Sequence, residues 1–170
     1  VVIGRGIRPA TSFVRGAALS PDGGVPVDDR LRAAPLVWAA GDAALFPEPY
    51  SGERARIEHW RVAQQHGRAA ARAMAGRPEP FSAVPFFWTQ QFLREVFYAG
   101  RGRGSDELIV QGDMEKWDFV AYYARGDRLV AACGTRGKEV GAFMELMRVS
   151  GLPAADALRG SRGIGLAAVL

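Results

Sequence analysis

The sequence changes character at a proline-rich stretch, residues 77–85, which reads RPEPFSAVP. Beyond it come five runs rich in aromatic and β-branched residues, separated by glycine-containing turns: FFWTQQF, EVFYAG, ELIVQG, DFVAYYA and RLVAACG. Such runs between glycine turns predict an antiparallel sheet, and the ARGDR that joins the last two has hairpin spacing. The proline-rich stretch therefore predicts a linker between two unlike parts, residues 1–80 and 81–170.

An amphipathic helix is expected after the last run, in the sequence KEVGAFMELMRVSG. Its apolar residues at offsets 0, 3, 4 and 7 are Val140, Phe143, Met144 and Met147. This spacing places them on one face of a helix, which we expect to pack on the sheet. Gly151 and Pro153 then end the helix. The second part is thus predicted to be a small α+β domain, an antiparallel sheet with helices.

The first part contains pieces that are typical of an α/β domain. The apolar run Val1–Ile3 before Gly4 predicts a buried strand. The apolar run Leu36–Ala40 predicts a strand covered on both faces. A short strand is expected around Val25–Val27, where Pro26 restricts it to a sheet edge. These pieces predict an incomplete α/β sheet.

A helix is expected from about Glu58 to Met74, within EHWRVAQQHGRAAARAMAG. Its residues at offsets 0, 4, 7 and 11 are Ala63, Gly67, Ala70 and Met74. They share one face of the predicted helix, and most of them are small. We therefore expect another element to pack very close to this face. Gly76 ends the predicted helix.

Charge, cysteine content and hydropathy argue against several classes of protein. The formal net charge is +4, but the arginines are scattered among acidic residues, whereas a nucleic-acid surface clusters them on one face. Cys133 is the one cysteine, so it makes no internal disulfide or CxxC pair, which favours a reducing, cytoplasmic compartment. With two histidines and one cysteine, no metal site is expected. No apolar run approaches the ~18 residues of a membrane span.

The chain opens with VVIGRGIRPAT, an apolar run that enters a glycine loop. A dinucleotide fingerprint needs Gly-x-Gly-x-x-Gly between a strand and a helix. Here Pro9 holds the place of the third glycine and no periodic helix follows. A pyrophosphate would find no helix N-terminus there. The opening loop is therefore not a complete fingerprint.

Six segments, taken in order, closely resemble the C-terminal part of the FAD-dependent ferredoxin reductase and apoptosis-inducing factor family. They are VVIGRGIRPAT, GGVPVDDRLR, VWAAGDAALFP, ARIEHWRVAQQHGRAAARAMAG, VPFFWTQQF and YAGRGRGSDELIVQGDMEKWDFVAYYARGDRLVAA. The resemblance runs from Val1 to about Arg159. In that family the chain builds an FAD domain, leaves it for an NAD domain and returns, and a strand ending in Gly-x-Gly-x-Arg-Pro marks the return. The opening glycines thus resemble the end of a dinucleotide domain.

The resemblance implies an α/β remnant of an FAD/NAD(P)-binding region in residues 1–80 and a reductase C-terminal α+β domain in residues 81–170. It implies an oxidoreductase that moves electrons from NAD(P)H through FAD to ferredoxin or another iron–sulfur carrier, and it is compatible with a homodimer. The FAD and NAD fingerprints are expected upstream of Val1. The segment alone is therefore expected to be inactive and to hold no tightly bound cofactor.

Gly41 and Asp42 are the first candidate cofactor-binding residues. They follow the apolar run Leu36–Ala40, and ligands of open α/β sheets bind beyond the carboxyl ends of the strands. A carboxylate there can accept hydrogen bonds from the ribityl hydroxyls of FAD, the role that the resemblance implies for Asp42. The alternative is that Gly-Asp only forms a turn after a strand.

Glu58, His59 and Trp60 mark the expected start of the helix. A helix N-terminus offers free N–H groups and a partial positive charge. The resemblance places it at the pyrimidine end of the flavin, so these three residues are implied to lie on the cofactor side. The alternatives are a capping or core histidine, a tryptophan that anchors the core, and a glutamate that only favours the helix dipole.

Trp88 is the candidate catalytic residue, because the resemblance places an aromatic side chain here, near the flavin where nicotinamide stacks. The alternative is packing between domains, since strand alternation puts Phe87 opposite Phe86 and Trp88. The loop GRGRGSD, residues 100–106, either steers an acidic redox partner or is a solvated turn.

Two other functions remain open from the residues alone. One is a folded dimerisation or protein-interaction module without activity of its own, which bound flavin would argue against. The other is nucleic-acid binding, which an oligonucleotide affinity that falls steeply with salt would support.

Overall fold

The computed structural model describes residues 1–159 and Gly163. The chain forms two compact units, Val1–Phe81 and Ser82–Leu170, and the division lies inside the proline-rich stretch. None of the helices in the described residues is long and apolar enough to cross a membrane.

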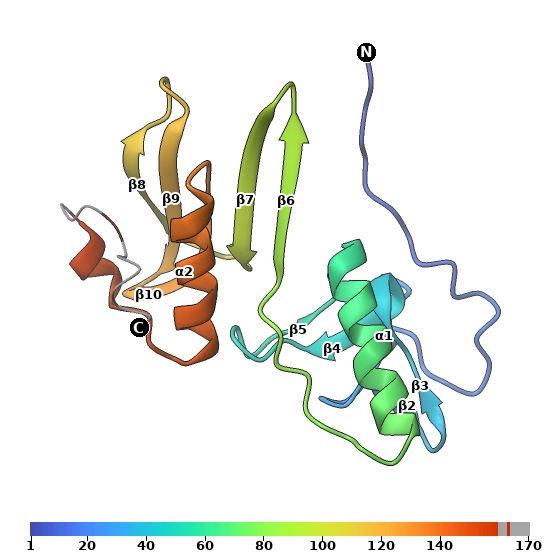
Figure 1. Ribbon diagram of the computed structural model, residues 1–170. Helices are drawn as coiled ribbons and strands as arrows, with labels where there is room; N and C mark the ends of the chain where they lie inside the picture. The colour runs from blue at the N-terminus through green and yellow to red at the C-terminus, as the bar shows by residue number, and fades with distance from the viewer. Residues whose placement is uncertain (160–162, 164–170) are drawn as a thin grey trace. The chain divides into compact units, whose positions relative to one another are not determined.

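The second unit is built on a five-stranded antiparallel sheet in the order β6-β7-β10-β9-β8 (Figure 1). The strands are β6 Phe86–Gln91, β7 Arg94–Gly100, β8 Glu107–Asp113, β9 Asp118–Arg125 and β10 Arg128–Gly134. The ARGDR turn joins β9 to β10 as a hairpin, with Arg125 paired to Arg128. The predicted antiparallel sheet is confirmed, because each run finds its partner within the same unit.

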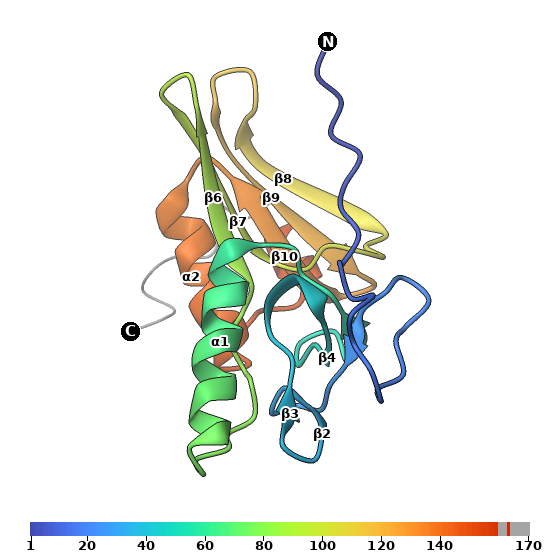
Figure 2. The same cartoon turned by 90° about the vertical axis from the view of Figure 1, so that its right-hand side faces the viewer.

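Helix α2, Gly137–Arg148, packs on β7 and β10 and lies against one face of the sheet (Figure 2). Its buried residues are Val140, Ala142, Phe143, Leu146 and Met147. Three of the four predicted core positions are therefore buried, and Met144 lies half-buried at the margin. The ring of Tyr122 on β9 packs 6.0 Å from that of Phe143 and is fully buried. A 3₁₀ turn, η2 Ala155–Leu158, follows the helix.

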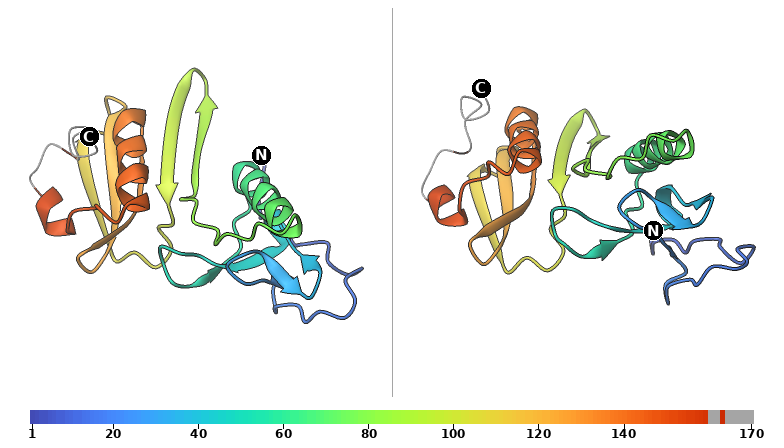
Figure 3. Two further views of the ribbon diagram at one scale, coloured as in Figure 1. Left: turned by 60° about the horizontal axis from the view of Figure 1, so that its bottom comes forward. Right: turned by 90° about the horizontal axis from the view of Figure 1, so that it is seen from below.

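The first unit contains short strands and one long helix (Figure 3). Its strands are β1 Val25–Pro26, β2 Arg32–Ala34, β3 Val37–Trp38, β4 Ala44–Pro47 and β5 Arg54–Ala55. A 3₁₀ turn, η1 Gly41–Ala43, precedes β4, and helix α1 spans Trp60–Met74. β1 pairs parallel to β4 at the edge of the sheet β1-β4-β5, which confirms the edge strand predicted from Pro26.

The predicted buried strand Val1–Ile3 is wrong. These residues form no strand, and each side chain is more than four-fifths exposed. A strand covered on both faces needs ladder partners on either side. Among the described residues no strand pairs with this run, so its apolar side chains lie in solvent.

The predicted strand Leu36–Ala40 is also wrong in length and burial. Leu36 is 86% exposed at φ 62° in a turn, and only Val37–Trp38 form a strand, which pairs with β2 alone. The buried strand of this region is β4, where Phe46 is 1% exposed. The unbroken apolar run predicted one strand, and its composition gave no sign of the turn at Leu36. Asp42 consequently lies before a buried strand and does not close one.

Helix α1 begins two residues later than predicted, with His59 as its N-cap. Its buried stripe is Val62, His66 and Ala70, whereas Gly67 and Met74 of the predicted face are exposed. Half of the predicted face is nevertheless confirmed, since Ala70 is buried and the turn η1 packs closely on Ala63; what the sequence did not reveal is the burial of His66. Its ring is instead a fully buried core element, packed edge-on against Phe46 and Phe81 with centroids 4.6 and 4.4 Å away.

Candidate functional site

The turn Gly41–Ala43 is held closely against α1. Gly41 is buried with φ +73°, a left-handed conformation that favours glycine. A Cβ at this position would lie 3.1 Å from the Cβ of Ala63 on α1. The backbone N–H of Gly41 donates to Nδ1 of His66, 3.3 Å away. The turn therefore depends on glycine for both its conformation and its contact with the helix.

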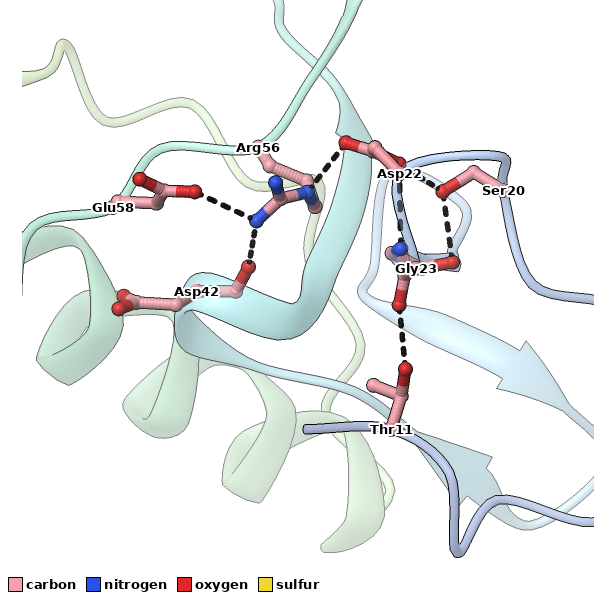
Figure 4. A network of polar contacts seen from close by, with 8 residues as sticks. Thr11, Ser20, Asp22, Gly23, Asp42, Arg56 and Glu58 are labelled. Carbon is pink, nitrogen blue, oxygen red and sulfur yellow. Dashed lines mark hydrogen bonds and ion pairs between the residues drawn. The ribbon is translucent and has the colours of Figure 1, made fainter. Parts of the chain in front are cut away.

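Arg56, between β5 and α1, joins three segments of the first unit (Figure 4). Its Nη1 donates to the backbone carbonyl of Asp42 at 2.8 Å and to Oε1 of Glu58 at 3.0 Å. Its Nε donates to Oδ2 of Asp22 at 2.7 Å. The structure thus brings the Gly41–Asp42 turn and Glu58 together through one guanidinium. Sequence reasoning missed Arg56, because one arginine in an arginine-rich chain carries no signal.

Asp22 and Glu58, and not the Asp42 carboxylate, form the ion pairs with the Arg56 guanidinium. Hydrogen bonds from Ser20 and from Arg56 hold the pKa of Asp22 well below its usual range. Asp22 in turn raises the pKa of Arg56, and Glu58 adds to this effect. The Asp42 carboxylate points away from Arg56 (Figure 4) and accepts no hydrogen bond from the residues that the structure describes. It is half-buried and available to accept hydrogen bonds from a ligand.

His59 and Trp60 stand side by side at the start of α1, with ring centroids 5.6 Å apart. Nδ1 of His59 accepts from the backbone N–H of Arg61 at 3.2 Å, so His59 has the capping role that was one alternative. Burial lowers the pKa of His59, as does Arg61, while Asp42 opposes the change. The ring is therefore neutral at neutral pH, as the cap requires. Trp60 is 63% exposed and is not a core anchor of this unit.

Trp88 belongs to the second unit, on β6. Its side chain is 44% exposed and its ring lies 6.3 Å from that of Phe86. Phe87 stacks on Tyr98 with a centroid distance of 5.1 Å. The predicted alternation thus holds, and Phe86 and Trp88 share a face of the sheet. The other five candidates, Gly41, Asp42, Glu58, His59 and Trp60, all lie in the first unit.

The GRGRGSD loop between β7 and β8 is braced from inside its own unit. The guanidinium of Arg125 donates to the carbonyls of Arg103, at 2.6 Å, and Gly104, at 3.1 Å. The N–H of Gly102 donates to the Tyr98 hydroxyl oxygen at 2.7 Å. No group of three or more His, Cys, Asp or Glu side chains in the described residues could hold a metal ion.

Two family models match the chain in succession. The model described as pyridine nucleotide-disulphide oxidoreductase matches residues 1–67, and the model described as Reductase C-terminal matches residues 86–161. The first matched range contains the Gly41–Asp42 turn and the start of α1, and the second contains Trp88.

Curated relatives extend the similarity over most of the chain. Apoptosis-inducing factor 3 of Homo sapiens is 42% identical over 134 residues, which cover 76% of this chain and 22% of that protein. The ferredoxin–NAD(+) reductase component of the anthranilate 1,2-dioxygenase system of Burkholderia cepacia is 30% identical over 156 residues, which cover 90% of this chain and 38% of that protein. The chain thus spans well under half the length of these relatives.

Solved structures of the same kind share the fold. The covalent putidaredoxin reductase–putidaredoxin complex matches with a TM-score of 0.80 and 26% identity, covering 91% of this chain and 37% of that chain. The crystal structure of Fdr9 matches with a TM-score of 0.78 and 30% identity, covering 92% of this chain and 42% of that chain.

Proposed function

The chain belongs to the ferredoxin reductase family of pyridine nucleotide-disulphide oxidoreductases, and on this premise we propose that it forms the C-terminal part of an FAD-dependent NAD(P)H oxidoreductase. The parent protein would move electrons from nicotinamide through FAD to an iron–sulfur protein. The single observation that carries this proposal is the Asp42 carboxylate beside the start of α1, which accepts no hydrogen bond from the described residues while Arg56 holds its backbone. We assign residues 1–80 to the FAD/NAD(P)-binding region and residues 81–170 to the reductase C-terminal domain.

The donors and acceptors around this turn fit one half of FAD. The free carboxylate of Asp42 suits the ribityl hydroxyls, and the close contact of Gly41 with α1 makes the turn rigid. The α1 N-terminus, with its partial positive charge, suits the electron-rich pyrimidine end of the isoalloxazine ring. His59 is neutral there and Trp60 presents an exposed aromatic surface. We propose that Gly41, Asp42, Glu58, His59 and Trp60 bind this half of the cofactor.

When bound, FAD supplies the redox chemistry, accepting a hydride and releasing electrons one at a time. The residues of this chain are proposed to bind and orient the cofactor and to shield it from water. Asp42 accepts hydrogen bonds, and Trp88 with Phe86 offers an aromatic face that we assign to the nicotinamide side. Such positioning is what a protein contributes to a reaction carried by its cofactor.

The isolated chain is proposed to bind FAD weakly. In this structure the first element after the opening glycines, Gly4 and Gly6, is strand β1, so no helix N-terminus follows them to receive a pyrophosphate. Flavin absorbance of the purified 170-residue chain measures this directly, and a stoichiometric amount of bound flavin would contradict it.

A ferredoxin is the proposed electron acceptor, which the similarity to a reductase solved in complex with putidaredoxin supports.

A cytoplasmic location and a homodimer complete the proposal. Cys133 as a single free thiol supports a reducing compartment. The turn between β6 and β7 supports self-association, because Phe92 and Leu93 are 97% and 92% exposed.

The proposal is tested on the parent polypeptide. Purified protein is mixed without oxygen with NADH or NADPH, and the bleaching of flavin absorbance is followed by reduction of an added [2Fe–2S] ferredoxin. We expect flavin bleaching by one of the two nucleotides and onward reduction of the ferredoxin. A parent protein that holds no flavin, or whose flavin neither nucleotide reduces, would refute the proposed function. A sedimentation measurement on the same sample tests the homodimer.

A further inference from the structure

We propose that Arg56 is a positioning residue of the FAD site: it fixes the Gly41–Asp42 turn against the start of α1 so that the Asp42 carboxylate faces the cofactor. The inference rests on the proposed function and deepens it, since it names the residue on which the geometry of that site depends.

The guanidinium of Arg56 reaches three segments that are distant from one another along the chain. Asp22 belongs to the loop before β1, Asp42 to the turn η1, and Glu58 to the lead-in to α1. The three donor–acceptor distances lie between 2.7 and 3.0 Å. A planar fork with several N–H donors can serve all three acceptors, whereas an ammonium is a single point charge.

The side chain of Arg56 is enclosed, which makes its contacts directional. It is 11% exposed, while the side chains of its partners Asp22 and Glu58 are 52% and 35% exposed. Its stem packs on Gly24, where a Cβ would lie 2.6 Å from Cδ of Arg56. The exposed ion pairs by themselves contribute little stability. The enclosed hydrogen bond to the Asp42 carbonyl is the contact that fixes the turn.

Arg56 holds the backbone of Asp42, and no described residue donates a hydrogen bond to the Asp42 carboxylate. A direct ion pair would occupy the carboxylate and compete with a ligand. Here Asp22 and Glu58 neutralise the guanidinium, so the turn is fixed while the carboxylate keeps its capacity to accept. Without Arg56, the remaining hydrogen bond between the turn and a side chain of the described residues is the 3.3 Å bond from the Gly41 N–H to His66.

The test measures the FAD dissociation constant of the parent apoprotein by fluorescence titration. We expect Arg56→Met to weaken FAD binding about tenfold or more, but by no more than Asp42→Ala does, because a misplaced Asp42 carboxylate loses its charge-assisted hydrogen bonds to the cofactor. Arg56→Lys, which keeps the charge but not the fork, should fall between Arg56→Met and the wild type. If Arg56→Met does not fold, the FAD dissociation constant of Arg56→Lys tests the inference in its place.

Arg54 supplies the matched control. Arg54 lies two residues before Arg56, and its Nη1 donates to the backbone carbonyls of Val27 and Leu45, at 2.9 and 3.0 Å, and not to those of the turn Gly41–Ala43. Arg54→Met should lower the melting temperature while leaving the FAD dissociation constant close to that of the wild type. If Arg54→Met and Arg56→Met weaken FAD binding equally, Arg56 has only a structural role and the inference is overturned.

A double variant shows whether Arg56 acts through Asp42. If it does, Asp42→Ala combined with Arg56→Met binds FAD about as weakly as Asp42→Ala alone. Fully additive losses would overturn the inference. If Asp42→Ala weakens FAD binding but Arg56→Met does not, the inference fails and the proposed function stands. If Asp42→Ala itself has no effect, the assigned cofactor site is wrong and the inference falls with it.

Discussion

His66 is the most enclosed polar side chain next to the candidate site. Its ring is fully buried, its Nδ1 accepts from the Gly41 N–H, and its Nε2 has no hydrogen-bond partner in the described part of the chain. Burial lowers the pKa of His66 to about 4. The neutral ring is therefore part of the folded state, and a proton on it would cost both desolvation and the contact to Gly41.

Because of His66, the free energy of unfolding of the chain should decrease as the pH is lowered. The unfolded chain gains a proton on this ring near pH 6.5, while the folded chain does so only near 4. Between these values the unfolded state binds more protons, so the free energy of unfolding decreases as the pH falls, by at most about 1.4 kcal/mol per unit. Urea unfolding across this window measures the slope.

His66→Asn is the control for this pH dependence, because Asn keeps an acceptor near the Nδ1 position but does not titrate. Its free energy of unfolding should change less over the same window than that of the wild type. Identical slopes for the two proteins would show that His66 is not the titrating group.

Trp88→Ala in the parent protein should separate cofactor binding from nicotinamide use. The indole is half-exposed on the face that it shares with Phe86, so its removal opens no buried cavity. We expect the flavin content to stay at the wild-type level, while the hydride-transfer rate and the charge-transfer absorbance with reduced nicotinamide change. Rapid mixing with reduced nicotinamide measures both, and Trp88→Phe, which keeps an aromatic face, should restore part of the rate. Unchanged kinetics in Trp88→Ala would leave Trp88 as a packing residue.

At the scale of elements, the two units differ in how much of their structure the sequence predicts. The strands of the second unit pair with their neighbours in the same segment, so alternation and glycine turns were sufficient. In the first unit an apolar run does not by itself predict a buried strand, because that depends on whether another strand pairs with it. Val1–Ile3 is exposed and Leu36–Ala40 contains a turn, although both read as buried strands.

Helix α1 offers a direct test of the corrected helix face. No other atom lies within 4 Å of a Cβ built on Gly67, so Gly67→Ala should stabilise the helix by about 1 kcal/mol. Gly41→Ala should destabilise the chain by about 1–2 kcal/mol, because its φ is +73° and its Cβ would press on Ala63. Chemical unfolding of both variants measures the difference. Destabilisation by Gly67→Ala would restore the closely packed face predicted from the sequence.

The candidate site shows the same limit of sequence reasoning. The resemblance named five residues of the first unit, and the structure joins two of them through Arg56. Arg56 was missed and the core role of His66 was not predicted, because both depend on contacts between segments that are distant along the chain. Burial of His66 and the guanidinium network become visible only when η1 packs on α1.

At the scale of the whole molecule, several basic side chains are paired with acidic ones inside the two units. In the described residues Arg56, Arg136, Arg148, Arg159 and Lys116 each form an ion pair with an acidic side chain. These five basic side chains are thus engaged within the units. This distribution favours the oxidoreductase over a nucleic-acid-binding protein, in agreement with the relatives that the chain matches.

The FAD affinity of the parent protein carrying Asp42→Ala tests the central claim most directly, namely that the Gly41–Asp42 turn binds the cofactor. Asp42 would supply charge-assisted hydrogen bonds of about 1.5–3 kcal/mol to a buried ligand. At about 1.4 kcal/mol per decade, the account predicts FAD binding weaker by about 10- to 100-fold. Fluorescence titration of the apoprotein measures it, with Arg54→Met as the control for a general loss of stability in the first unit. An Asp42→Ala protein that binds FAD as tightly as the wild type would contradict the account and leave Asp42 as a turn residue.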